Sequence, residues 1–295
     1  MYNTKMFKGL IYSFISAFAF ASMAVFVKIG YAAGLTTKEM LFFRFVFASV
    51  FLFLFLLIKY PKKLIINGGL LKKSLLMGGL FYASQSYCFF ASIKHISPSI
   101  TELILYLYPA FVTLLAAIVF KERFDIFKFL YITIILAGFI FIFGDALNSR
   151  IRLLGVLLGF AAMVIYSVYL IVVQQFLKNE DVLSLTFYTI VFTTITFFVL
   201  FNKDVGALSL KQTGVVVSLG LISTVIAIGF LFLSIDAIGS SLTSVFSSFE
   251  PVITIILSGA VLGIGMTLHQ IIGAVLILIG VFSANIYHLR FQKDG

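Results

Sequence analysis

Long apolar runs separated by short polar breaks make up almost the whole of this chain. When each run is read against the glycine, proline and charged residues that bound it, the pattern predicts ten membrane-spanning helices. Their expected ranges are 10–31, 39–58, 73–93, 98–120, 127–144, 153–177, 183–201, 212–235, 240–262 and 268–288. A helix of about 20 apolar residues crosses a bilayer, so the runs have the right length.

Composition supports a chain that works within a membrane throughout. Hydrophobic residues make up 62% of its 295 residues and charged residues 11%, whereas soluble domains are roughly half apolar and roughly a quarter charged. Ten spans with short connections account for the length, and we expect no separate soluble domain.

The formal net charge of +10 is a topology signal rather than a sign of nucleic-acid binding, because the lysines gather in short loops. With the N-terminus inside, thirteen basic residues are cytoplasmic and six are external, while Lys28 and Arg44 remain in spans. Cytoplasmic loops carry the excess of lysine and arginine in membrane proteins. We therefore expect a multi-pass protein of the bacterial inner (plasma) membrane with both termini cytoplasmic.

The second half of the chain repeats the first. With an offset of 142 residues, 78–138 aligns with 220–280 without a gap. The matched pairs include Gly78/Gly220, Ser92/Ser234, Thr101/Thr243, Pro109/Pro251 and Gly138/Gly280. Offsets of 146 and 145 extend the match upstream and pair Gly9 with Gly155 and Phe47 with Phe192.

Each repeat holds five spans, and the expected units are residues 7–145 and 152–289. Because five is odd, the second copy enters the membrane from the opposite side. The expected fold class is an all-α membrane protein of two inverted five-helix repeats. Inverted repeats give outward-open and inward-open states of similar energy, which alternating access requires.

Short motifs accompany the duplication: Phe43-Arg44-Phe45, Tyr108-Pro109, Lys121-Glu122-Arg123, Glu250-Pro251, and the glycines Gly138 and Gly280. In this combination the chain resembles the EamA-type transporters of the drug/metabolite transporter superfamily. The resemblance implies a central cavity formed by the third, fourth, eighth and ninth spans with the first and sixth, and export of amino acids or other small metabolites. One departure is Ile264, where the second copy of such proteins carries a glutamate like Glu122.

An ionisable group inside the membrane costs at least a few kcal/mol, which makes it a functional candidate. Glu250 lies about ten residues into the ninth span, before Pro251, which removes a backbone donor and loosens the helix. Such a carboxylate either binds a substrate amine or coupling proton, or is structural and bonds neighbouring hydroxyls. Thr243, Ser247 and Thr254 share its helix face.

In the fourth span, Glu102, Tyr106, Pro109 and Thr113 share one helix face. Their spacing of four, three and four residues is the same as that of Thr243, Ser247, Glu250 and Thr254 in the ninth span. Glu102 is either a binding or gating residue or a carboxylate at the membrane interface. The candidates for coupling or gating are therefore Glu102, Glu250, Pro109 and Pro251.

Several tyrosines lie too deep in their spans for an interfacial belt. Tyr82, Gln85 and Tyr87 in the third span, and Tyr166 and Tyr169 in the sixth, either line a cavity or pack between helices. The expected substrate-binding residues are Tyr82, Gln85, Tyr106, Tyr166, Tyr169, Ser247 and Glu250. We expect them to face a single space near the membrane midplane, where inverted repeats meet.

Arg44 lies about two turns below the outer surface, and its expected role is structural, bonding freed carbonyls or a carboxylate such as Glu39. The alternative is that it binds a substrate carboxylate. The three histidines share no metal-like spacing, and Cys88 is the only cysteine. We expect no metal, cofactor or catalytic residue.

Three classes of function compete: a transporter, a membrane-embedded enzyme, and a receptor or scaffold. The chain has no His-Glu-x-x-His, Asp pair or Gly-x-Ser-x-Gly at membrane depth, and no Gly-x-x-x-x-Gly-Lys. The sequence favours a secondary transporter exporting amino acids or similar metabolites, rather than an enzyme or a primary ATP-driven pump. A drug, nucleoside or lipid-like substrate, moved by exchange or facilitated diffusion, is the alternative. The expected partners are a small-molecule substrate, protons and membrane lipids, with no nucleic acid, in a monomer or homodimer.

Overall fold

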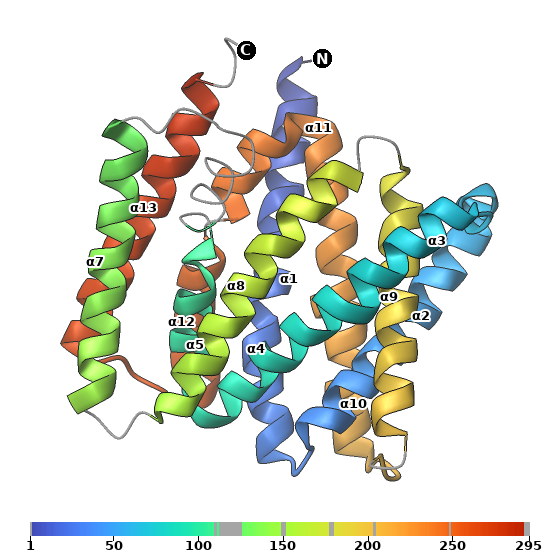
Figure 1. Ribbon diagram of the computed structural model, residues 1–295, viewed down its shortest axis with the longest axis horizontal. Helices are drawn as coiled ribbons and strands as arrows, with labels where there is room; N and C mark the ends of the chain where they lie inside the picture. The colour runs from blue at the N-terminus through green and yellow to red at the C-terminus, as the bar shows by residue number, and fades with distance from the viewer. Residues whose placement is uncertain are drawn as a thin grey trace.

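The computed structural model describes residues 2–108, 111, 126–148, 152–176, 180–202, 205–247 and 249–291. These residues form a bundle of helices with both chain ends on the same side (Figure 1). The elements are α1 (Tyr2–Ala32), α2 (Thr37–Lys59), η1 (Pro61–Leu64), α3 (Gly68–Ser74), η2 (Leu75–Tyr82), α4 (Ala83–His95), α5 (Pro98–Leu105), α7 (Ile126–Asn148), α8 (Leu153–Phe176), α9 (Val182–Phe201), α10 (Leu210–Gly220), η3 (Leu221–Ile226), α11 (Ala227–Ser247), α12 (Glu250–Leu262) and α13 (Leu268–Phe291).

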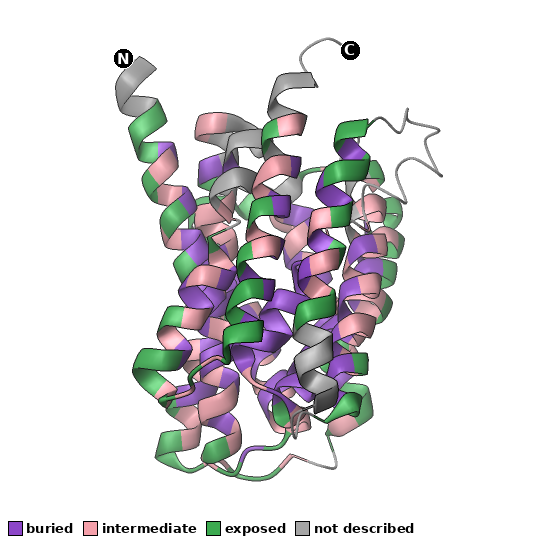
Figure 2. Ribbon diagram, turned by 90° about the vertical axis from the view of Figure 1, so that its left-hand side faces the viewer, coloured by how far each residue is buried: buried purple, intermediate pink, exposed green. Residues whose placement is uncertain are grey.

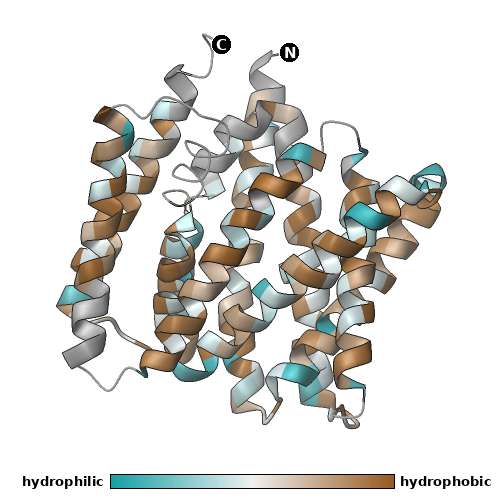
Figure 3. Ribbon diagram, in the orientation of Figure 1, coloured by the Kyte–Doolittle hydropathy of each residue, from teal (hydrophilic) through white to brown (hydrophobic). Residues whose placement is uncertain are grey.

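Length and composition identify the helices as membrane spans. Within the described part of the chain, five stretches are long and apolar enough to cross a membrane: Met6–Ala32, Thr37–Lys59, Leu153–Val173, Leu183–Phe201 and Leu210–Leu231. Large apolar side chains such as Phe14, Phe53 and Ile140 are exposed. The outer faces of the bundle carry the exposed residues (Figure 2), and the helices are hydrophobic between more polar ends (Figure 3). The protein is therefore a multi-pass membrane protein.

The described elements group into ten membrane helices, five in each repeat. The third helix is α3, η2 and α4 in one continuous run, and the eighth is α10, η3 and the first limb of α11. The π-helical segments η2 and η3 occupy equivalent positions in the two repeats. A π-helix is rare and often marks a functional region, so its occurrence in both copies supports the duplication.

Glycines at equivalent positions allow helices of the two repeats to approach closely. A Cβ at Gly78 would lie 2.0 Å from the carbonyl oxygen of Thr189 on α9. A Cβ at Gly220 would lie 3.0 Å from the carbonyl oxygen of Arg44 on α2. Thr189 is the repeat equivalent of Arg44, at the offset of 145 that also relates Phe47 to Phe192. The contact of Gly78 with Thr189 is thus equivalent to the contact of Gly220 with Arg44.

Helices α7 and α13 pack together through the same symmetry. A Cβ at Gly138 would meet Ile277 at 2.9 Å, and a Cβ at Gly280 would meet Ile135 at 2.4 Å. Each isoleucine and each glycine has its partner 142 residues away. These paired contacts establish the predicted arrangement of two inverted repeats.

Hydroxyl groups form a second pair of equivalent links. The Ser92 hydroxyl donates to the carbonyl oxygen of Gly155 at 2.8 Å and lies 3.1 Å from the Thr101 hydroxyl. The Ser234 hydroxyl donates to the Gly9 carbonyl oxygen at 3.1 Å and lies 2.9 Å from the hydroxyl of its own threonine, nine residues ahead. Each link ties two consecutive helices of one repeat to the first helix of the other.

The second of these links shows how α11 is built. Nine residues of a straight helix extend about 13.5 Å, yet the Ser234 and Thr243 hydroxyls lie 2.9 Å apart. The chain must therefore turn back between them. Helix α11 contains the end of the eighth membrane helix and the start of the ninth, so the predicted break between 235 and 240 is a bend within helical backbone.

At the side of the bundle where the chain ends lie, ion pairs join the repeats. Lys63 of η1 pairs with Asp181, and Lys73 of α3 pairs with Glu180 at 2.7 Å. The Asp181 carboxylate also caps α9 by accepting from the backbone N–H of Ser184. Partial burial opposes ionisation of Asp181, but the hydrogen bonds from Lys63 and Ser184 outweigh it and lower the pKa of this carboxyl.

This carboxylate gives a pH dependence that Asp181→Asn isolates, because asparagine also caps helices well. A pKa lower in the folded than in the unfolded state stabilises the protein above about pH 4, and the effect is lost as pH falls through the folded value. We expect the variant to be less stable than wild type by up to about 1 kcal/mol from pH 8 to pH 5, since exposed ion pairs are screened. Thermal unfolding in detergent should show this gap closing below about pH 4; a gap that persists there would contradict the assignment.

Candidate functional site

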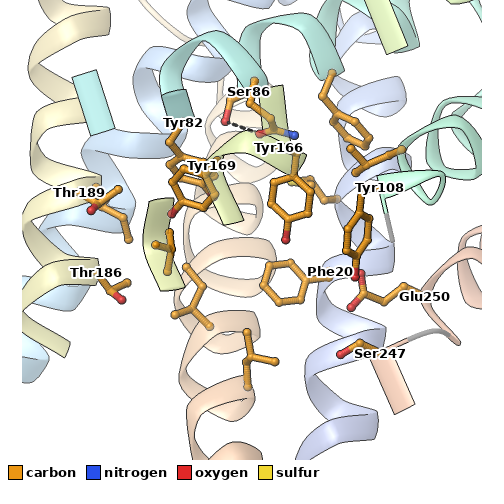
Figure 4. Close-up of a pocket in the computed structure, with 18 of the residues that line it drawn as sticks. Phe20, Tyr82, Ser86, Tyr108, Tyr166, Tyr169, Thr186, Thr189, Ser247 and Glu250 are labelled. Atoms are coloured by element: carbon orange, nitrogen blue, oxygen red, sulfur yellow. Dashed lines mark hydrogen bonds between the residues drawn. The ribbon is translucent and has the colours of Figure 1, made fainter. Parts of the chain in front are cut away.

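A cavity of about 360 Å³ lies at the centre of the bundle, between the two repeats (Figure 4). Its described lining residues are Phe20, Met23, Arg44, Met77, Tyr82, Gln85, Ser86, Phe89, Glu102, Leu105, Tyr106, Tyr108, Tyr166, Tyr169, Val173, Leu185, Thr186, Thr189, Ile190, Ile228, Leu231, Thr243, Ser247 and Glu250. Ligand pockets for small molecules are typically about 300–1,000 Å³ and mostly apolar with a few polar groups. The cavity has both properties.

The lining is built from equivalent positions of the two repeats. Seven pairs of repeat equivalents contribute both members: Phe20/Tyr166, Met23/Tyr169, Arg44/Thr189, Ser86/Ile228, Phe89/Leu231, Leu105/Ser247 and Tyr108/Glu250. A cavity lined in this way lies on the pseudo-two-fold axis that relates the repeats. In transporters with inverted repeats, substrates bind at this interface.

Both repeats interrupt a helix beside the cavity. Helix α5 ends at Leu105, and α12 begins at Glu250 after a break that follows Ser247. The two breaks start at repeat-equivalent residues. The carbonyl oxygen of Ser247, at the end of its helix, accepts a hydrogen bond of 2.7 Å from the Tyr106 hydroxyl. Irregular backbone at membrane depth is tolerated where it is buried in protein or lines a cavity, and here it brings polar groups to the cavity wall.

Five tyrosines form a continuous aromatic wall. Ring centroids are 5.7 Å apart between Tyr106 and Tyr108, and 5.1 Å between Tyr108 and Tyr166. The stacked pairs Tyr166/Tyr169 and Tyr169/Tyr82 follow at 6.0 and 5.7 Å. These rings offer flat apolar surfaces and polar tips to one space, which suits an organic molecule with an apolar body.

Both acids of the cavity lie where α5 and α12 approach each other. Glu102 on α5 is 3% exposed, and its Oε2 has no hydrogen-bond partner among the described residues. Glu250 begins α12, which packs against α5, and it lines the same cavity. Figure 4 places Glu250 and Ser247 beside Tyr108, on the opposite side of the cavity from Thr186 and Thr189.

The one cation among the described lining residues is Arg44. Its side chain is 2% exposed, its Nε donates to the Thr224 hydroxyl at 2.9 Å, and its guanidinium lies over the rings of Phe45 and Phe90. Glu39, suggested from the sequence as a partner, instead completes the capping box at the start of α2 with Thr36. Arg44 therefore joins α2 to the π-helical segment η3 at the edge of the cavity.

All seven residues expected to bind substrate line this one cavity, although their role in binding remains a prediction. Glu102 also lines it. Pro251 is buried in the first turn of α12, just after the break within the ninth membrane helix, and Pro109 lies outside the described residues. Of the two alternatives left open for Tyr87, the structure shows helix packing: this residue is 40% exposed, packs against Phe201 and is not among the lining residues.

Sequence reasoning missed part of the wall. Helices α2 and α9, which were not expected to line the cavity, supply Arg44, Thr186 and Thr189. The repeat itself held the missing signal, because Thr189 is the equivalent of Arg44, and Phe20 is the equivalent of Tyr166.

Comparison with known proteins decides the family. The model of the EamA-like transporter family matches residues 7–144 and again residues 153–286. The chain belongs to the EamA-like transporter family. Among EamA-like relatives, the chain is 31% identical over 206 residues to the uncharacterized transporter YyaM of Bacillus subtilis (strain 168), covering 67% of each protein.

A solved crystal structure shares the fold of this EamA-like protein. It aligns with 96% of this chain and 98% of its own, with a TM-score of 0.65 and 18% identity. At that identity the likeness concerns the fold alone. The family and the relative together identify the EamA-like protein as a membrane transporter of small molecules.

Proposed function

We propose that this protein is a secondary transporter that exports amino acids or similar small metabolites across the bacterial inner membrane by alternating access. The observation that carries the proposal is the central cavity, whose wall is built from equivalent residues of two inverted repeats. Because each repeat can adopt the conformation of the other, the same residues can line a cavity open to either side. The excess of basic residues in loops on the side of the chain ends supports a cytoplasmic location for both termini.

The chemistry of the wall favours a particular range of substrates. Its aromatic rings fit an apolar body, while its few charged groups are two carboxyls and one guanidinium that is already bonded. A phosphate ester would require clustered arginine or lysine side chains. A zwitterionic or modestly cationic metabolite fits better. The cavity volume also agrees with a small molecule rather than a peptide or lipid.

A direct test combines ligand binding with access from both sides. Metabolites are first screened for those that raise the melting temperature of the purified protein, since a ligand of the folded state stabilises it. Ser247→Cys in a Cys88→Ala background is then reconstituted into liposomes and treated with a membrane-impermeant thiol reagent from each side in turn.

Alternating access predicts that this cysteine reacts from either side, and that a stabilising metabolite slows both reactions. Ser283→Cys is a control, because this half-buried residue on α13 is not among the described lining residues of the cavity; any labelling of it should not change with the metabolite. Reaction of the Ser247→Cys protein from one side alone, with and without ligand, would argue against alternating access.

A further inference from the structure

The acidic part of the cavity contains a buried carboxyl group whose hydrogen bonding is incomplete among the described residues. Glu102 is 3% exposed, yet no residue that the structure describes forms a hydrogen bond with its Oε2. Buried polar atoms in proteins are nearly always paired, and an exception calls for an explanation such as a bound ligand or ion. Because Glu102 lines the cavity, a molecule in that space lies beside this carboxyl group.

A second carboxyl group lines the same cavity. Glu250 comes from α12, which packs against α5, and it too lines the cavity. Two neighbouring carboxylates shielded from water repel each other strongly and require a positive charge between them. The question is therefore which positive charge the cavity provides.

The helices around Glu102 offer no such charge within the described cavity wall. Helix α5 packs against α1, α4, α8, α12 and α13. The titratable or charged lining residues on these elements and next to α5 are Glu250, Tyr106, Tyr108, Tyr166 and Tyr169. Lys28 of α1 is directed to the carbonyl oxygen of Ile93 at 3.4 Å, and Arg44 is bonded to Thr224. Within the described wall, the positive charge is therefore left to a bound proton or to the substrate.

The repeat does not supply a second copy of this pair of acids. The equivalent of Glu250 is Tyr108, and the equivalent of Glu102 is Ser244. Neither acid therefore has an acidic counterpart at the equivalent position of the other repeat. The nearby tyrosine rings add faces that attract a cation.

We propose that Glu102 and Glu250 form one cation site that holds either a proton or the ammonium group of the substrate, but not both. The proposal deepens the proposed function, on which it rests: the substrates are amines with an apolar body. When the ammonium group enters, it supplies the positive charge between the carboxyls, and the proton they shared leaves to the water on the open side. Transport then exchanges substrate for a proton, since an empty site can carry the proton back.

Three probes of similar shape and different charge test the site: phenethylamine, phenylalanine and 3-phenylpropionate. We expect the amine and the zwitterion to raise the melting temperature of the wild-type protein, and the carboxylate to have no effect. In weakly buffered solution, a pH indicator should report about one proton released for each amine bound, because linked proton binding follows from mutual exclusion.

The variant Glu102→Gln should release no proton and bind phenethylamine at least about 10-fold more weakly, since a charge-assisted hydrogen bond is lost. Glu39→Gln is the matched control, because it makes the same chemical change outside the cavity and glutamine still suits a capping box. It should behave as wild type. Circular dichroism checks folding, and proton release by the wild type tests the proposal even if the variant does not fold.

The outcomes separate the inference from the proposed function. Stabilisation by 3-phenylpropionate alone, or amine binding without proton release, overturns the shared cation site while leaving transport of small metabolites intact. If no probe stabilises the protein and counterflow in liposomes moves none of them, the amine specificity fails. A blank thermal-shift result for the whole metabolite screen would in addition count against the proposed function.

Discussion

Replacing Glu250 by glutamine is expected to reduce transport by roughly 10- to 100-fold. The change keeps the size of the side chain and removes its negative charge at the start of α12, beside Tyr108 in the cavity. Hydrogen bonds to charged groups contribute about 1.5–3 kcal/mol, and each 1.4 kcal/mol is a factor of about ten in affinity. The measurement is counterflow into proteoliposomes of a metabolite that stabilises the wild-type protein.

The same assay distinguishes a binding carboxylate from a structural one. A structural role would reduce the amount of folded protein and leave the transport rate per folded molecule unchanged. Glu39→Gln, outside the cavity, should transport at the wild-type rate. Wild-type transport by the Glu250→Gln protein between pH 5 and pH 8 would show that Glu250 has no part in the transport cycle.

The second large effect concerns the seam between the repeats, at Gly78. We expect Gly78→Ala to lower the free energy of unfolding by about 3 kcal/mol, or to prevent folding. A Cβ there would lie 2.0 Å from the carbonyl oxygen of Thr189, so that η2 and α9 would have to move apart. Overpacking of this kind typically costs about 1–3 kcal/mol, and more when backbone blocks the new atom.

A matched substitution separates this steric effect from helix propensity. Gly214→Ala lies within α10, where nothing would come within 4 Å of the new Cβ. Alanine is a better helix former than glycine by roughly 1 kcal/mol, so this variant should be as stable as wild type or slightly more stable. Thermal melts of both variants in the same detergent provide the comparison. Equal melting temperatures would mean that the repeats do not meet closely at Gly78.

The fold was largely readable from the sequence because its signals come in pairs. Gly78/Gly220 and Gly138/Gly280 stand at the close contacts between helices, so their exact spacing of 142 residues revealed both the repeat and its importance. Apolar runs gave the spans directly. Asp236, Gly239, Ser240 and Ser241 marked the break between the eighth and ninth spans. Less predictable was that helical backbone continues through this break as a bend within α11.

The candidate site was predictable where polar groups interrupt an apolar span. Glu102, Glu250 and the deep tyrosines stood out for that reason. The orientation of a span that is apolar all round has no such signal. Sequence alone could not decide that Thr186 and Thr189 of α9 face the cavity, or that Tyr87 turns away from it.

The hydroxyl links described for Ser92 and Ser234 determine which parts of the protein can move as one. Ser92 ties α4 and α5 of the first repeat to α8 of the second, and Ser234 ties α11 to α1. The two groups of helices held together by these links are therefore not the two sequence repeats, because each group includes the first helix of the other repeat. The alternating access proposed above would therefore separate these two groups of helices. Selection for transport then acts on both halves of the sequence together, and neither half alone would be expected to work as a carrier.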